Sequence, residues 1–338
     1  MSQKDVKALI SELEVAAEED DVERMAELCE EILEADPENV DARLYLAELA
    51  YDDGDLDAVI ALGEEVLERD EHNDEARLLM AEAYLAGDQP EDALELCDVL
   101  LRKNPNHFEA RFVLAESLVE LGGAKEAVEL YESIIEEQPD HVGAMLGLGV
   151  ALYESCQFDA AAQALEEVIE IEPELADAYF HLGLIQERKG QTAAAEKSFK
   201  RARHLEPEAY PAPLKMSVAE FDKVTSEVLK SLPPRLREAL QNVPISVEER
   251  PSEQELLSSE PPLSPNIWGL FRGQTHAEAS QADPFARMPS EIVLFRANLL
   301  RGVANKRELL DEVRTTLLHE IGHYLGLDEE GVAALGLK

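Results

Sequence analysis

The sequence predicts an α-solenoid of helical hairpins followed by a small α+β domain. A 34-residue repeat runs through the first two thirds of the 338 residues, and the last third mixes helix-like and strand-like patterns instead. The charge changes at the same place, because residues 1–213 carry −38 and residues 214–338 only −5 of a total of −43. We therefore expect two domains, which is also the usual number for a chain of this length.

Prolines and small residues recur at the 34-residue spacing. Small side chains at fixed positions let two helices approach closely, and a proline after the second helix ends it. Glycine-containing turns lie between the helices of each unit. Each unit is therefore expected to be a pair of antiparallel helices, and stacked pairs form a solenoid. The columns in this register are Pro37, Pro105, Pro139, Pro173 and Pro207, then Ala42, Ala76, Ala110, Ala144 and Ala178, and then Ala93, Ala127, Ala161 and Ala195.

This pattern resembles the tetratricopeptide repeat, and about six units fit between residues 6 and 209 of a repeat domain at 1–209. The resemblance implies a concave groove lined by the first helix of each pair. On that alignment the groove contains Asp41, Glu48, Glu75, Glu82, Glu109, Glu116, Phe112 and Phe180. An acidic groove with apolar pockets favours an extended, basic peptide of a protein partner. The alternative is a solvated or halophilic acidic face.

Residues 210–216 read as a linker, because prolines break helix propagation there. The second domain, 217–338, begins with a capping box at Ser217 and Glu220. Strands are expected at 242–248, 267–271 and 290–295, a loop at 251–265, and a helix at 305–325.

The last predicted helix carries the HExxH pattern at His319, Glu320 and His323. Histidines four residues apart project from one helical face and can share one zinc ion. Glu320 can take a proton from a water molecule that zinc activates for attack on a peptide carbonyl. The pattern therefore predicts a zinc-dependent hydrolase.

A catalytic zinc needs a third protein ligand. Gly326 allows a left-handed turn that folds the chain back toward the metal. In the HExxHxxGxx(H/D) pattern of metzincin-like enzymes the last ligand falls on Glu329, with Asp328 as the close alternative and His276 as a remote one.

The whole segment from about residue 220 to 337 resembles the small bacterial zincin-like metallopeptidases, through stretches such as Gly269-Leu-Phe-Arg-Gly273 and Leu317-Leu-His-Glu-Ile-Gly-His. The resemblance implies a minimal zincin fold, one zinc ion per chain and peptide-bond hydrolysis. It also implies that substrate pairs with an edge strand, for which we expect 292–296 with Ile292, Leu294 and Phe295. The rival interpretations are a non-catalytic adaptor with an inactive zinc-binding module and a hydrolase of small amides.

Composition excludes some partners. A net charge of −43 disfavours nucleic acids and anionic membranes, which are polyanions themselves. We expect no membrane insertion, because no apolar run approaches the roughly 18–20 residues that span a bilayer. The three separated cysteines and the lack of a secretion signal predict a reducing cytoplasm.

Overall fold

The computed structural model describes residues 3–19, 21–275 and 290–327. By packing, the chain divides into two compact units, residues 1–152 and 153–338. The division falls inside the repeat array, so the second unit joins the last repeat helices to the α+β domain. The domain limits expected from the sequence, at 209 and 217, remain predictions.

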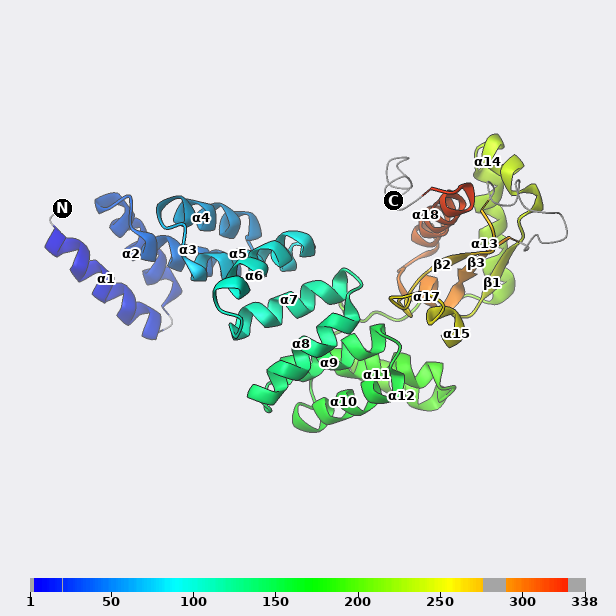
Figure 1. Ribbon diagram of the computed structural model, residues 1–338, viewed down its shortest axis with the longest axis horizontal. Helices are drawn as coiled ribbons and strands as arrows, with labels where there is room; N and C mark the ends of the chain where they lie inside the picture. Colours follow the sequence, from blue (N-terminus) through cyan, green and yellow to red (C-terminus); the bar gives the residue numbers. More distant parts are fainter. Residues whose placement is uncertain (1–2, 20, 276–289, 328–338) are drawn as a thin grey trace. The chain divides into compact units, whose positions relative to one another are not determined.

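The predicted helical hairpins are confirmed, and Figure 1 shows helices following one another in antiparallel pairs along each unit. The first unit holds α1 (Gln3–Glu18), α2 (Val22–Ala35), α3 (Val40–Asp52), α4 (Leu56–Arg69), α5 (Asp74–Ala86), α6 (Pro90–Lys103), α7 (Phe108–Glu120) and α8 (Ala124–Glu137). Helix α9 (Val142–Glu154) spans the division, and α10 (Phe158–Ile171), α11 (Ala176–Arg188) and α12 (Thr192–Leu205) belong to the second unit.

The repeated small residues lie where the helices touch. The alanines of the first column, from Ala42 to Ala178, are all fully buried. At four of the five repeats, the side chain three residues before this column caps the helix that follows, and Leu175 is the exception. Asn39 and Asn73 accept a hydrogen bond there from the backbone N–H of the column alanine at 2.9 and 2.8 Å, and His141 does so through Nδ1 at 2.9 Å. The repeat therefore specifies both the start of a helix and its close packing.

Within residues 217–275 and 290–327, the α+β domain contains a sheet of three strands in the order β1-β3-β2. Strand β1 (Ile245–Glu248) is parallel to β3 (Glu291–Phe295), whereas β2 (Gly269–Arg272) is antiparallel to it. The helices described in this domain are α13 (Val218–Ser231), α14 (Pro234–Ala239), the 3-10 turn η1 (Leu240–Asn242), α15 (Glu253–Leu256), α17 (Arg296–Arg301) and α18 (Lys306–Leu325). The expected strands are thus confirmed in shorter form, and the expected loop at 251–265 contains a one-turn helix.

The core of this domain forms where α13 and α18 pack on one face of the sheet, as Figure 1 shows. Phe221 on α13, Ile292 and Leu294 on β3, and Leu317 on α18 are all fully buried there. The predicted capping box starts α13, since Ser217 accepts from the backbone N–H of Glu220 and the Glu220 carboxylate accepts from Ser217. Within the described residues, no helix has the length and apolar character needed to cross a bilayer.

Candidate metal centre and repeat groove

Helix α18 presents the HExxH residues from a face beside its buried stripe. Leu309, Val313, Leu317 and Ile321 are each at most 1% exposed and anchor the helix to the core. Asn305 caps the start of this helix, because its side chain accepts from the backbone N–H groups of residues 307 and 308. The helix ends at Gly326, whose φ of +87° is the left-handed conformation expected there.

The two histidines converge. The Nε2 atoms of His319 and His323 lie 2.9 Å apart, and their rings are nearly perpendicular with centroids at 4.6 Å. Two nitrogens on one tetrahedral zinc ion, each at about 2.0–2.1 Å, are separated by roughly 3.3 Å. The pair therefore fits two positions of a zinc site with little adjustment.

The candidates predicted for a third ligand lie outside the residues that the structure describes. Among the described residues no group of three or more His, Cys, Asp or Glu side chains could hold a metal. The predicted candidates Asp328, Glu329 and His276 all lie outside the described residues. The choice between them stays a prediction.

Glu320 is buried between its own helix and strand β2, with only 6% of its surface exposed. A Cβ atom on Gly269 would lie 3.1 Å from Glu320 Cγ, 3.2 Å from its Oε1 and 2.6 Å from Thr316 Cγ2. Glycine at the start of β2 thus lets the helix approach the strand and leaves room for the carboxylate.

A pocket of about 480 Å³ opens beside His319 and Glu320. Its lining comes from α18 and from the chain that leads into β2: Ser264, Asn266, Ile267, Trp268, Gly269, Thr315, Thr316, His319 and Glu320. One imidazole and the carboxylate therefore face a space that can admit a substrate. Tyr324, in contrast, packs in the core with its ring 5.8 Å from that of Phe271.

The expected edge strand was wrong. Strand β3 is the middle strand, paired on both sides, and Ile292, Leu294 and Phe295 are fully buried. They form core, so they cannot contact an extended substrate. Of the described strands, β2 is the edge beside α18, because it pairs only with β3.

The predicted groove residues of the repeats form an acidic series. Asp41, Glu48, Glu75 and Glu109 are exposed, whereas Glu82 and Glu116 are partly buried. Burial and the neighbouring carboxylates raise the pKa of Glu48 and Glu82, and for Glu116 they raise the pKa to about 7. The charges therefore lie close enough to repel one another.

The aromatic groove residues have partners within the chain. Phe112 lies against Tyr131 and His141, with ring centroids 6.0 and 5.3 Å away. Phe180 lies against Tyr210 of the linker, at 4.6 Å. Near the start of the array, a pocket of about 210 Å³ combines acidic and apolar side chains: Ile10, Leu13, Glu14, Asp41, Ala42, Leu44, Tyr45, Glu48 and Glu75.

Sequence reasoning missed most of the pocket wall. Asn266, Trp268 and Thr316 carry no motif that marks them. Gly269 did carry a signal, because a glycine within a strand pattern often marks a close backbone approach.

Comparisons with known proteins agree with both halves of the chain. Tetratricopeptide-repeat families match residues 21–74, then 50–116, 88–140 and 118–184, and finally 176–208. A family described as zincin-like metallopeptidase matches residues 240–337. No curated protein matches the chain significantly by sequence.

Several solved structures are similar to part of the chain. One is YrrB, described as a TPR protein with an unusual peptide-binding site, at 21% identity and a TM-score of 0.43, covering 54% of this chain and 94% of YrrB. Another is MamA 41-end from Desulfovibrio magneticus RS-1, at 21% identity and a TM-score of 0.44, covering 50% of this chain and 95% of that one. A thermophilic TPR protein from Thermus thermophilus has 20% identity and a TM-score of 0.44 over 50% and 93% of the two chains. From the family matches, the chain is a tetratricopeptide-repeat protein that carries a zincin-like metallopeptidase domain at residues 240–337.

Proposed function

We propose that the protein is a zinc-dependent peptide hydrolase whose repeat array recruits a protein or peptide. The observation that carries the proposal is the convergence of two imidazole nitrogens, 2.9 Å apart, beside a pocket that His319 and Glu320 line. A zinc ion bound there would supply a Lewis acid that polarises a peptide carbonyl and makes water more acidic.

The protein's own groups supply the proton transfers and the orientation. His319 and His323 would hold the metal, one ion per chain, together with Glu329 or Asp328. Glu320 would accept a proton from the attacking water and pass it to the leaving amine. Strand β2, with its edge beside α18, would hold an extended substrate through backbone hydrogen bonds.

Metal content and hydrolysis test this proposal separately. We expect about one zinc per wild-type chain, and its loss in His319→Ala and His323→Ala. The exposed His204 on α12 provides the matched control, because His204→Ala should keep the metal. Glu320→Gln should retain zinc but lose hydrolysis of a peptide library. Zinc binding without hydrolysis would favour a non-catalytic adaptor with an inactive zinc-binding module. Hydrolysis of small amides but not of peptides would favour a small-amide hydrolase. Absence of zinc would overturn all three interpretations.

The groove favours a basic partner. Its mutually repelling carboxylates, two of them partly buried, would gain from a lysine or arginine side chain placed among them. We expect basic peptides to bind more weakly at 0.5 M than at 0.05 M salt, concentrations across which the screening length falls about threefold. Glu82→Gln and Glu116→Gln should each weaken binding. The control Glu132→Gln also removes one carboxylate, from an exposed position on α8 outside the predicted groove residues, and should not weaken it. Salt-independent binding would instead support the solvated acidic face.

The cytoplasmic location remains a prediction. The three cysteines are free and buried, as expected for small core residues in a reducing compartment.

A further inference from the structure

Residues 263–268, here called the wall loop, connect α15 to β2 and form one side of the pocket beside the HExxH residues. The loop contributes Ser264, Asn266, Ile267 and Trp268 to that pocket. Within its own domain, Asn298 of α17 donates from Nδ2 to the carbonyl oxygens of residues 265 and 267, at 3.0 and 2.8 Å. The position of the wall loop therefore affects the width of the pocket.

The end of α9 holds the wall loop through a side-chain amide. Tyr153 donates from its hydroxyl to Asn266 Oδ1 at 3.0 Å, and Asn266 Nδ2 donates to Glu154 Oε1 at 2.8 Å. Tyr153 is only 1% exposed, so its hydroxyl is fixed by packing. Both ends of the Asn266 amide are thus bonded to a repeat helix, which determines the orientation of this pocket residue.

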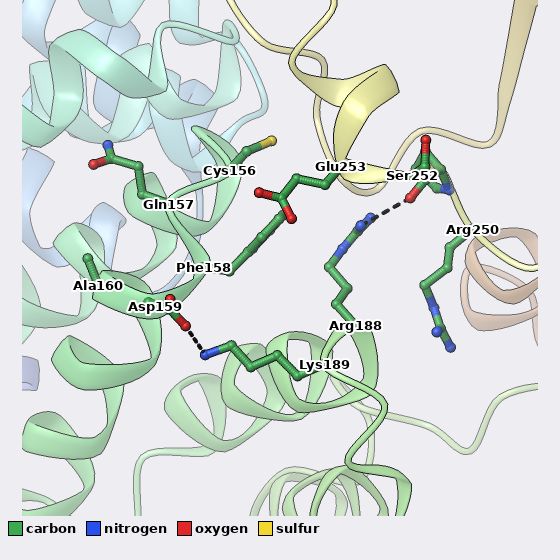
Figure 2. A pocket seen from close by; sticks show the side chains of 11 residues that line it. Cys156, Gln157, Phe158, Asp159, Ala160, Arg188, Lys189, Arg250, Ser252 and Glu253 are labelled. Atoms are coloured by element: carbon green, nitrogen blue, oxygen red, sulfur yellow. Dashed lines mark hydrogen bonds and ion pairs between the residues drawn. The ribbon is translucent and has the colours of Figure 1, made fainter.

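The end of α11 holds the same loop through an arginine. Arg188 donates from Nη2 to the carbonyl of Pro265 at 2.8 Å and from Nη1 to that of Pro251 at 3.2 Å. Its guanidinium lies 5.2 Å from the ring centroid of Phe158. Figure 2 shows this side chain reaching from α11 toward residues 250–253, across a pocket of about 680 Å³. The planar fork therefore ties two loop segments to one helix.

An ion-pair cluster lies beside this contact. Glu187, the neighbour of Arg188 on α11, pairs with Arg250 at 3.1 Å and with Arg301 at 2.8 Å. Arg301 ends α17, the helix that also carries Asn298. Through Glu187, the repeat helix α11 thus also contacts α17, the helix that holds the wall loop from within the α+β domain.

We infer that the last repeat helices are part of the hydrolytic unit, with Tyr153, Glu154 and Arg188 as positioning residues that hold the wall loop against the pocket. This inference rests on the proposed hydrolase function. The repeats then do more than recruit a partner, because their last helices determine the shape of the pocket. A displacement of about 1 Å within a reaction site can cost on the order of 100-fold in rate, so removing these contacts should lower kcat.

The test uses the full chain and two variants, Tyr153→Phe and Arg188→Leu. The first removes one oxygen atom and leaves the ring, so folding should be retained. The matched control is Arg201→Leu, because Arg201 also donates to a proline carbonyl, that of Pro173 at 3.0 Å, and lies over an aromatic ring, but within the repeats. Arg188→Lys, which can still reach one carbonyl, serves as the conservative variant.

Trp268 gives a readout that needs no activity, because it is the single tryptophan of the chain and lies in the wall loop. We expect acrylamide to quench its fluorescence more strongly in Tyr153→Phe and Arg188→Leu, with wild-type behaviour in Arg201→Leu. We also expect kcat to fall about tenfold with little change in KM or zinc content, because the pocket wall is displaced and the metal ligands are not, and Arg188→Lys to recover part of the loss.

Two results would overturn the inference. One is unchanged quenching of Trp268 in Tyr153→Phe, which would show that the hydroxyl does not position the wall loop. This result counts even where Arg188→Leu fails to fold. The other is an equal loss of kcat in the Arg201→Leu control, which would reduce the effect to general stability. A wild-type protein without hydrolysis would instead refute the proposed function, and the quenching comparison would still decide whether the repeats position the loop.

Discussion

Replacing Gly269 by alanine tests the close approach between β2 and α18 that shapes the site. The added Cβ would lie 2.6 Å from the Thr316 methyl carbon and 3.1 Å from Glu320 Cγ. The first distance is shorter than carbon atoms tolerate, and both side chains are buried, with 7% and 6% of their surfaces exposed. The helix or the strand must therefore move.

The expected loss of stability in Gly269→Ala follows from this contact. Overpacking a tight core by one methyl group usually lowers the free energy of unfolding by about 1–3 kcal/mol. In a unit of this size, each kcal/mol lowers the melting temperature by about 2–4 °C, so a decrease of roughly 2–12 °C is expected. Because Glu320 also borders the new methyl group, hydrolysis should fall more than stability alone explains.

Thermal unfolding followed by Trp268 fluorescence reports on this unit, since the chain has no other tryptophan. A second change, Thr316→Ser, removes the methyl group that clashes. The double variant should therefore be more stable than the sum of the two single effects predicts, by about 1 kcal/mol. Hydrolysis should stay low in the double variant, because the contact with Glu320 persists.

A control separates packing from function. Gly63→Ala on α4 places a Cβ 2.4 Å from Met80 Cγ, a comparable clash in the first unit, which contributes no residue to the pocket. Its unfolding is followed by circular dichroism. It should lower the melting temperature and leave zinc content and kcat of the folded protein unchanged. A wild-type melting temperature for Gly269→Ala, or simple additivity in the double variant, would refute the reasoning.

Three further predictions concern other parts of the molecule. Burial and nearby carboxylates raise the pKa of Glu116 from 4.5 to about 7. Between these two pH values the folded chain keeps a proton that the unfolded chain releases. The free energy of unfolding should therefore fall by at most about 3 kcal/mol as the pH rises from 4.5 to 7. Urea unfolding with amide exchange in α7 checks this, and Glu116→Gln should flatten the profile. Gly326→Ala should destabilise by about 1 kcal/mol in the same urea assay, because φ is +87° there. Burial raises the pKa values of Cys29, Cys97 and Cys156 to about 11, 12 and 11, so iodoacetamide at pH 8 should label them only after denaturation; rapid labelling of the native chain would contradict this.

The sequence predicted the elements well where the signal was local. The column from Ala42 to Ala178 is periodic, so it indicates hairpins without knowledge of any long-range contact. The placement of β3 was the error. Its continuous apolar run, Ile292-Val-Leu-Phe295, is typical of a strand buried on both faces, and that signal favoured the centre of the sheet over its edge.

The sequence by itself determined the repeat, the change of charge near residue 213 and the HExxH residues on one helical face. These follow from spacing along the chain, because helical geometry fixes which side chains share a face. Only the tertiary structure decided that β2 is the strand edge beside the helix, that Gly269 makes room for Glu320, and that repeat helices hold the wall loop. The hydroxyl of Tyr153 bonds to an amide 113 residues away, and no local pattern specifies such a pairing.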